Sequence, residues 1–274
     1  MLSMELSPKT KPVGLIGHPV EHSLSPKLQN HIYTTMEMDY VYLAFDVQEN
    51  MLQKTVEGMR SLHFTGFNVT IPYKEKVIPL LDEIDPQAAL IGAVNTVQRK
   101  DGKLIGYNTD GLGFMHSLHV RGISCKGKRI LVVGAGGAAR AIGIYIAMEE
   151  PECIYIQNRT FDKALALSNC INMSYPSVIT IPIINIPKPI DMIINTTSLG
   201  MWPKIEDNPL KGYSFHPDQV VCDIVYNPRM TKLLEYAQLA GCTIVGGIDM
   251  LVAQAIKAIE IWTGKIVPME ISNL

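Results

Sequence analysis

An apolar run followed at once by closely spaced glycines lies near the middle of the chain and constrains its fold more than any other segment. Residues 129–133 predict a buried strand, residues 137–148 predict a helix, and the loop between them fits G-x-G-x-x-G/A with Ala139 in the third position. Glycines permit a sharp turn and a close approach of phosphate to the backbone, and the helix N-terminus offers unpaired N–H groups. The unit therefore indicates a dinucleotide-binding site, and a ligand-free glycine turn is the weaker alternative. The expected phosphate-binding residues are Gly134, Ala135, Gly136, Gly137 and Ala138.

Short β-rich runs alternate with longer helical runs along the chain, which is typical of α/β folds with mostly parallel sheets. We expect two α/β domains: residues 1–110 together with 246–274, and residues 111–245 as a Rossmann-type domain. The amphipathic run 250–262 predicts a last helix that returns to the first domain. Ser25-Pro26 predicts a helix start, with Ser25 as N-cap. Strands are predicted at 12–17, 41–47, 66–70, 93–98, 103–107, 129–133, 153–157, 192–195, 220–224 and 243–245, and helices at 26–36, 51–62, 110–121, 137–148, 163–171 and 231–240.

The end of the second strand of the Rossmann-type domain bears on the choice between NAD and NADP. A carboxylate there would bind the ribose 2′-hydroxyl of NAD. The chain has Asn158-Arg159-Thr160 instead, with Lys163 nearby. A guanidinium and a hydroxyl suit a 2′-phosphate, although Asp162 partly offsets the positive charge. These residues predict NADP as the cofactor.

Composition excludes several other classes of protein. Hydrophobic residues make up 47% and charged residues 18% of the chain, and the formal net charge is −2, so nucleic acid and anionic membranes are not expected partners. The first eleven residues lack the apolar core of a secretory signal, and glycines interrupt the apolar stretch 130–148. Five cysteines without a C-x-x-C pair indicate reduced thiols in the cytoplasm. His18 and His22 are four residues apart but Pro19 prevents a shared helix, so no metal site is predicted.

Six further motifs occur in order along the chain. They closely resemble the shikimate dehydrogenase family, and the resemblance runs from about Val13 to Trp262, nearly the whole sequence. It implies an NADP-dependent oxidoreductase that interconverts 3-dehydroshikimate and shikimate, a step of chorismate and aromatic amino acid biosynthesis. The motifs are His22-Ser23-Leu24-Ser25-Pro26, Asn68-Val69-Thr70-Ile71-Pro72-Tyr73-Lys74, Gly92-Ala93-Val94-Asn95-Thr96, Asn108-Thr109-Asp110-Gly111, Asn195-Thr196-Thr197-Ser198-Leu199-Gly200-Met201 and Met250-Leu251-Val252-Ala253-Gln254.

The resemblance assigns roles to residues whose types already suit the chemistry. Lys74 and Asp110 correspond to the catalytic pair of the family, and reduction of a ketone needs a proton donor as the hydride arrives. Without the resemblance, Lys74 would be interpreted as a solvated lysine and Asp110 as a helix cap. A polyhydroxy carboxylate needs hydroxyl and amide partners around its ring. The expected substrate-binding residues are Ser23, Ser25, Thr70, Asn95, Tyr226 and Gln254.

Further cofactor contacts rest on the resemblance alone. The loop Asn195–Met201 resembles the segment beside the nicotinamide, and the hydride is expected to cross a cleft between the domains. Gly246 and Asp249 depart from the family pattern at the edge of that cleft. The cofactor-binding residues implied in addition to the glycine loop and to Asn158, Arg159, Thr160 and Lys163 are Thr196, Ser198, Met201, Ile224, Gly247 and Met250.

Two alternatives remain open at this point. An NAD-linked quinate/shikimate dehydrogenase would tend to carry Ser in place of Thr70 and an acidic residue near Asn158. A non-catalytic nucleotide sensor could share the fold, but it need not keep both Lys74 and Asp110. The oligomeric state, monomer or homodimer, is left undecided.

Overall fold

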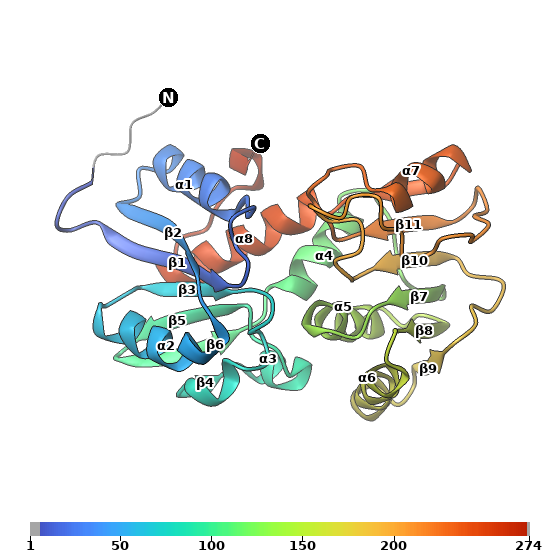
Figure 1. Cartoon of the computed structure of the whole chain (residues 1–274), viewed down its shortest axis with the longest axis horizontal. Coiled ribbons are helices and arrows are strands. Elements are labelled where there is room, and N and C mark those ends of the chain that lie inside the picture. The colour runs from blue at the N-terminus through green and yellow to red at the C-terminus, as the bar shows by residue number, and fades with distance from the viewer. Residues whose placement is uncertain (1–5, 273–274) are drawn as a thin grey trace. The chain divides into compact units, whose positions relative to one another are not determined.

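A computed structural model describes residues 6–272, which form two compact units. One unit extends to Thr109 and resumes at Val252, and the other comprises Asp110–Leu251. Each unit holds one six-stranded sheet with helices packed on it (Figure 1). The predicted α/β class with two domains is therefore confirmed. Residues 246–251, which we expected in the first domain, cluster with the second unit.

The sheet of the first unit is mixed, whereas we expected mostly parallel pairing. Its order is β2-β1-β3-β5-β6-β4, and β5 runs antiparallel to both of its neighbours. The reversal from β5 to β6 follows from a two-residue turn, because Asp101 and Gly102 both have positive φ (51° and 81°), as hairpin turns of the Asp-Gly type require. The strands are β1 (Lys11–Gly17), β2 (Tyr40–Asp46), β3 (Gly66–Val69), β4 (Glu83–Ile84), β5 (Thr96–Lys100) and β6 (Lys103–Tyr107).

The C-terminal helix packs on the first unit, as predicted. The helix α8 (Ile248–Thr263) carries Trp262, whose Nε1 donates to the carbonyl of Val97 in β5 at 2.9 Å. Trp262 also fills the space above Gly66, where a Cβ would lie 2.2 Å from the indole nitrogen. The other helices of this unit are α1 (Ser25–Thr35), α2 (Leu52–Ser61) and α3 (Pro86–Ile91).

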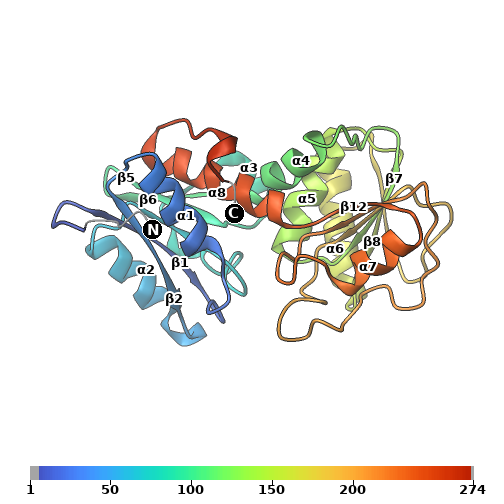
Figure 2. The same ribbon diagram turned by 90° about the horizontal axis from the view of Figure 1, so that it is seen from above.

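The sheet of the second unit is entirely parallel, with the order β12-β11-β10-β7-β8-β9. From β7 the chain proceeds through β8 to β9 at one edge of the sheet, and from β10 it proceeds through β11 to β12 at the other edge. Because crossovers between parallel strands are right-handed, α5 and α6 lie on one face of the sheet and α7 lies on the opposite face (Figure 2). The order reverses between β7 and β10, and in such sheets ligands bind beyond the carboxyl ends of the strands at this point. The elements are β7 (Arg129–Val133), β8 (Cys153–Gln157), β9 (Ile179–Ile183), β10 (Met192–Asn195), β11 (Val220–Asp223), β12 (Thr243–Val245), α4 (Asp110–His119), α5 (Gly137–Met148), α6 (Phe161–Ser174) and α7 (Lys232–Leu239).

Among residues 6–272, no helix is long and apolar enough to cross a membrane. The five cysteines all lie within these residues, and no disulfide joins them.

Candidate active site

The glycine loop connects β7 to α5 at the point where the strand order reverses. Gly134 has φ +118°, and a Cβ there would lie 2.3 Å from Oγ1 of Thr196, so this position accepts no side chain. Gly136 has ordinary extended dihedrals, and a Cβ there would meet no protein atom within 4 Å. Its lack of a side chain therefore leaves open space above the helix N-terminus, where a phosphate group can bind. Ala135 is buried, and Gly137 and Ala138 form the first turn of α5.

The loop after β8 lies directly beside the glycine loop. The N–H of Gly134 donates to the carbonyl of Gln157, the last residue of β8, at 2.8 Å. Asn158 Nδ2 donates to the carbonyl of Thr160 at 2.8 Å and so closes this loop. Arg159 and Lys163 both lie exposed at its surface. Two cations beside the expected phosphate site are suited to an additional phosphate group.

The loop after β10 contacts the glycine loop from the other side. Thr196 Oγ1 donates to the carbonyl of Val133, the last residue of β7, at 2.7 Å. Farther along this loop Ser198 and Met201 are exposed, and the N–H of Met201 donates to the carbonyl of Ser198. The structure therefore brings the loops after β7, β8 and β10 together at the carboxyl edge of the parallel sheet.

A fully buried carboxylate lies behind these loops. Asp223, at the end of β11, accepts hydrogen bonds from Asn195 Nδ2 (2.9 Å), from the N–H of Val225 (3.0 Å) and from Thr231 Oγ1 (2.7 Å). Burial raises the pKa of Asp223 to about 6, and the hydrogen bonds from Val225, Thr231 and Asn195 oppose that rise. We had predicted no role for Asp223 from the sequence. An acidic residue ending an otherwise apolar strand was the available signal.

The remaining expected residues of this unit follow β11 and β12. Gly247, which precedes α8, approaches Ile224 so closely that a Cβ would lie 2.3 Å from its carbonyl oxygen. Met250 is buried on α8, and Tyr226 is half-buried in the loop after β11. Asp249 forms an ion pair with Arg121 at 2.5 Å, which ties the start of α8 to the segment after α4.

The order and directions of the strands place several of the expected substrate-binding residues of the first unit at one edge of its sheet. β1 and β3 are parallel neighbours, so the loop that carries Ser23 and the residue Thr70 both follow carboxyl ends. Because β5 is antiparallel, Asn95 just before it lies at the same edge, as do the residues after β6. Asn95 and Thr109 are buried; Asn95 Nδ2 donates to Thr109 Oγ1 at 3.0 Å, and Asn95 Oδ1 accepts from the backbone N–H of Thr109 at 2.9 Å.

The two expected catalytic residues belong to different units, Lys74 to the first and Asp110 to the second. Lys74 is half-buried in the turn after β3, and its carbonyl accepts a hydrogen bond from the N–H of Val94 at 2.8 Å. Asp110 directly follows Thr109, is 5% exposed and opens α4. Thr70 is half-buried, and its N–H donates to the carbonyl of Ile16.

Helix α1 starts differently from the prediction. Ser25 is the first helical residue, Leu24 occupies the N-cap, and no side chain caps the helix. Ser23 Oγ instead accepts from the N–H of Ser25 at 3.2 Å, because the turn before the helix brings these residues together. Ser25 is buried, and Gln254 is half-buried on α8.

Asn68 is a buried residue whose importance the sequence analysis missed. Its Oδ1 accepts from Gln29 Nε2 (3.0 Å) and Tyr42 OH (2.8 Å), and its Nδ2 donates to the Asn95 carbonyl (3.1 Å) and to Thr96 Oγ1 (3.0 Å). This amide joins α1 and β2 to the edge that carries Asn95. An amide within the otherwise apolar strand β3 was the available signal.

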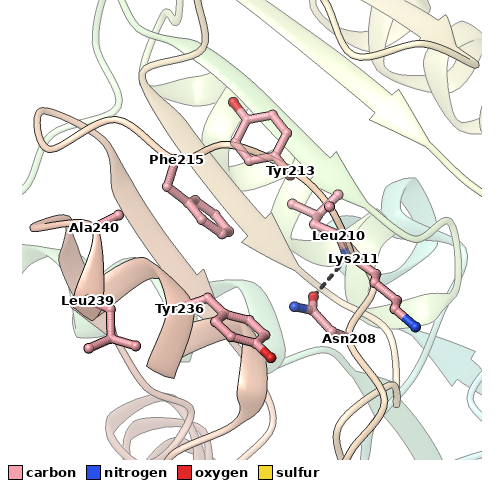
Figure 3. A pocket seen from close by; sticks show the side chains of 9 residues that line it. Asn208, Leu210, Lys211, Tyr213, Phe215, Tyr236, Leu239 and Ala240 are labelled. Atoms are coloured by element: carbon pink, nitrogen blue, oxygen red, sulfur yellow. Dashed lines mark hydrogen bonds between the residues drawn. The ribbon is translucent and has the colours of Figure 1, made fainter.

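Other features of the described residues lie apart from these loops. No group of three or more His, Cys, Asp or Glu side chains within residues 6–272 could hold a metal ion. An open hollow of about 470 Å³ is lined by Tyr213, Phe215 and Tyr236, among others (Figure 3). The segment of Tyr213 and Phe215 precedes β11 and Ala240 precedes β12, so the hollow lies toward the amino ends of these strands, away from the glycine loop.

Comparison with known proteins gives a consistent result. The family model for the shikimate dehydrogenase substrate binding domain matches residues 15–97, and that for the shikimate 5'-dehydrogenase C-terminal domain matches residues 247–270. The shikimate dehydrogenase (NADP(+)) of Alkaliphilus metalliredigens is 43% identical over 98% of this chain and 97% of its own length.

Solved structures agree over the same span. A crystal structure of a shikimate dehydrogenase in complex with NADP+ is 41% identical, with a TM-score of 0.93, and the match covers 99% of this chain and 96% of that one. The enzyme from Thermus thermophilus, solved in complex with NADP(H) and shikimate, is 32% identical, with a TM-score of 0.85 and coverage of 96% and 97%. With a glycine loop, a cationic loop after β8 and a polar sheet edge in the other unit, this chain belongs to the shikimate dehydrogenase family.

Proposed function

We propose that this chain is an NADP-dependent shikimate dehydrogenase, which reversibly reduces 3-dehydroshikimate to shikimate in aromatic amino acid biosynthesis. The proposal rests on one combination of features: the first unit has a polar sheet edge, and the other unit of the same chain has a glycine loop suited to a dinucleotide. One unit is suited to a polyhydroxy carboxylate and the other to a nicotinamide cofactor. We assign substrate binding to residues 1–110 with the C-terminal helix, and NADP binding to the Rossmann-type unit.

The polar edge suits the substrate because it offers neutral hydrogen-bonding groups. Thr70 supplies a hydroxyl and Asn95 an amide, and the bonds of Asn95 to Thr109 hold that amide in one orientation. Such groups can donate to and accept from ring hydroxyls without a charge that would need its own partner. Ser23, Ser25, Tyr226 and Gln254 complete the proposed set.

Lys74 and Asp110 are the proposed catalytic pair. In the oxidation of shikimate, the C3 hydrogen leaves as a hydride to C4 of the nicotinamide while the C3 hydroxyl loses its proton. Lys74 binds this oxygen and takes up the proton, and in the reverse reaction it returns a proton to the forming alkoxide. Asp110 is proposed to orient the amino group of Lys74 toward this oxygen.

The proposed cofactor is NADP, because Arg159 and Lys163 stand beside the glycine loop where NAD-specific proteins carry a carboxylate. The guanidinium can bind the 2′-phosphate in a bidentate manner. Asn158 and Thr160 shape this loop, and Thr196, Ser198, Met201, Ile224, Gly247 and Met250 are proposed to surround the remainder of the cofactor. We expect the enzyme to work in the cytoplasm as a monomer or a homodimer, and size-exclusion chromatography with light scattering distinguishes the two.

The decisive experiment follows the absorbance of reduced nicotinamide with shikimate or quinate as substrate and NADP+ or NAD+ as cofactor. We expect the highest kcat/KM with shikimate and NADP+. Faster turnover of quinate with NAD+ would favour the NAD-linked alternative, and no turnover with any pair would leave the nucleotide sensor.

A matched pair of lysine variants tests the mechanism. Lys74→Ala should lower kcat by about 10²- to 10⁴-fold while NADP+ still binds, because the general acid–base group is lost. Lys76→Ala is the control, since Lys76 is an exposed lysine two positions away that pairs with Glu49. Its kcat should stay within about twofold of wild type, because exposed ion pairs contribute little. Equal activity of both variants would contradict the role of Lys74.

A further inference from the structure

Two loops at the carboxyl edge of the parallel sheet share one buried anchor. Asp223 is 1% exposed and Asn195 is completely buried, so both lie within the protein interior behind the loops. Asp223 ends β11 and Asn195 ends the neighbouring strand β10, and the two are paired in register. Their hydrogen bond therefore joins the two strands at the point where both loops begin.

Asn195 connects the Asp223 carboxylate to the loop Asn195–Met201. Because Nδ2 donates to Asp223, Oδ1 must face the other way, where it accepts from the N–H of Thr197 (3.0 Å) and from Thr197 Oγ1 (2.7 Å). Thr197 Oγ1 in turn accepts from the N–H of Leu199 at 3.2 Å. The conformation of this loop thus depends on which way the Asn195 amide points.

Asp223 fixes the second loop by the same means. It accepts from the N–H of Val225 in the loop that carries Tyr226, and from the hydroxyl of Thr231, the N-cap residue of α7. Thr231 Oγ1 also accepts from the N–H of Leu234 at 3.4 Å. The Asp223 carboxylate therefore accepts three hydrogen bonds: one from β10, one from the loop after β11 and one from the N-cap residue of α7.

We propose that Asp223 is a positioning residue for hydride transfer, which acts through Asn195 and Val225 to hold the two loops that face the nicotinamide. The inference rests on the proposed function, because these loops are the ones assigned to the nicotinamide half of NADP. Asp223 itself touches neither substrate nor cofactor. Its effect is on the alignment of the hydride donor and acceptor, to which rates are sensitive within about 1 Å.

The substitution Asp223→Leu tests this with the same branching of the side chain. Two methyl groups stand where the two carboxylate oxygens were, so no acceptor is left for Asn195 Nδ2, for the N–H of Val225 or for the Thr231 hydroxyl. An asparagine is less informative, because its oxygen could keep the bonds from Asn195 and Val225 while its NH₂ donates to Thr231 Oγ1.

The matched control is Asp191→Leu at the opposite end of the same sheet. Asp191 accepts from the N–H, Nε and Nη2 of Arg129 at 2.8, 3.0 and 2.8 Å, and it directly precedes β10. It is the same chemical change in a carboxylate of similar bonding, at the amino ends of the strands. We expect this variant to be less stable than wild type but to keep the normal alignment of hydride donor and acceptor.

The measurements are kcat, the KM for shikimate, the Kd for NADP+, the primary isotope effect with shikimate deuterated at C3, and the thermal midpoint. For Asp223→Leu we expect kcat to fall by about 10- to 100-fold with a larger isotope effect, because misalignment slows the hydride step. The Kd for NADP+ should change by less than about threefold, since the phosphate sites are separate. Asp191→Leu should lower the thermal midpoint and leave kcat within about twofold of wild type.

A second pair of variants keeps the test decisive if Asp223→Leu does not fold. Thr231→Val removes the hydroxyl and should lower kcat, whereas Thr231→Ser keeps it and should restore kcat. A normal kcat and isotope effect in Asp223→Leu, or in Thr231→Val, would overturn the inference and leave a structural role only. Absence of turnover in the wild-type chain would instead refute the proposed function, and this inference with it.

Discussion

Replacing Gly134 by alanine should destabilise the second unit, for two reasons that can be added. The residue has φ +118°, a conformation that costs a side-chain-bearing residue about 1–3 kcal/mol. The new Cβ would also lie 2.3 Å from Thr196 Oγ1, so that hydroxyl must move and lose its hydrogen bond to Val133, worth about 1 kcal/mol. The expected loss is about 3 kcal/mol, or about 6–12 °C in thermal midpoint for a chain of this size.

The control is Gly136→Ala, the same substitution two positions away. Gly136 has φ −87°, and its Cβ would contact no protein atom, so the loss of stability should stay below about 1 kcal/mol. The new methyl group would instead occupy the space above the helix N-terminus. We expect the Kd for NADP+ to rise by about tenfold or more, because the backbone no longer approaches the pyrophosphate closely.

Differential scanning fluorimetry and NADP+ titration of both variants give the assay. We expect opposite effects of the two substitutions: Gly134→Ala should mainly lose stability, and Gly136→Ala should mainly lose affinity for NADP+. A thermal midpoint of Gly134→Ala within about 2 °C of wild type would refute the structural argument. Equal destabilisation by both substitutions would refute the assignment of separate roles to the two glycines.

Three further predictions address the cofactor, the buried carboxylate and the C-terminal helix. Arg159→Gln should raise the KM for NADP+ by about 10- to 100-fold and leave that for NAD+ unchanged, since a hydrogen bond to a charged group is worth about 1.5–3 kcal/mol; equal effects on both cofactors would contradict it. Burial raises the pKa of Asp223 to about 6, so between the ordinary carboxyl value and pH 6 the folded protein retains a proton that the unfolded chain has lost. Stability from this group should therefore rise by about 1.4 kcal/mol as the pH falls from 7 to 5, and urea unfolding of Asp223→Asn should lack this increment. Trp262→Phe should cost about 2 kcal/mol by leaving the Val97 carbonyl without its donor, and an unchanged urea midpoint would count against the docking of α8 on β5.

Much of the second unit was predictable from the sequence because its elements are locally encoded. The strand predictions at 129–133, 153–157, 192–195 and 243–245 coincide with the observed strands. The strands β7 and β10 in particular are apolar runs that are almost completely buried, and such runs differ clearly from the helices between them. The first unit was less predictable, since the short helix α3 and the two-residue strand β4 carry too little periodicity to be recognised.

Contacts between residues distant in sequence could not be predicted in the same way. The bond between Asn195 and Asp223 joins residues 28 positions apart, and that between Gln29 and Asn68 joins residues 39 positions apart. Each residue alone is compatible with a turn or a cap, and only the parallel register of the strands brings the partners together. The same holds for Ser25, where the observed turn replaced the predicted cap.

The sequence by itself determined the class of fold, the glycine loop with its cofactor type, and, through six ordered motifs, the family. These properties depend on local patterns and on residue identity, which tertiary structure does not alter. Only the tertiary structure decided that Gly134 must lack a side chain because of Thr196, and that Asp223 anchors two loops at once. The physical reason is that steric exclusion and buried hydrogen bonding act between atoms that become neighbours only when the strands pair in register.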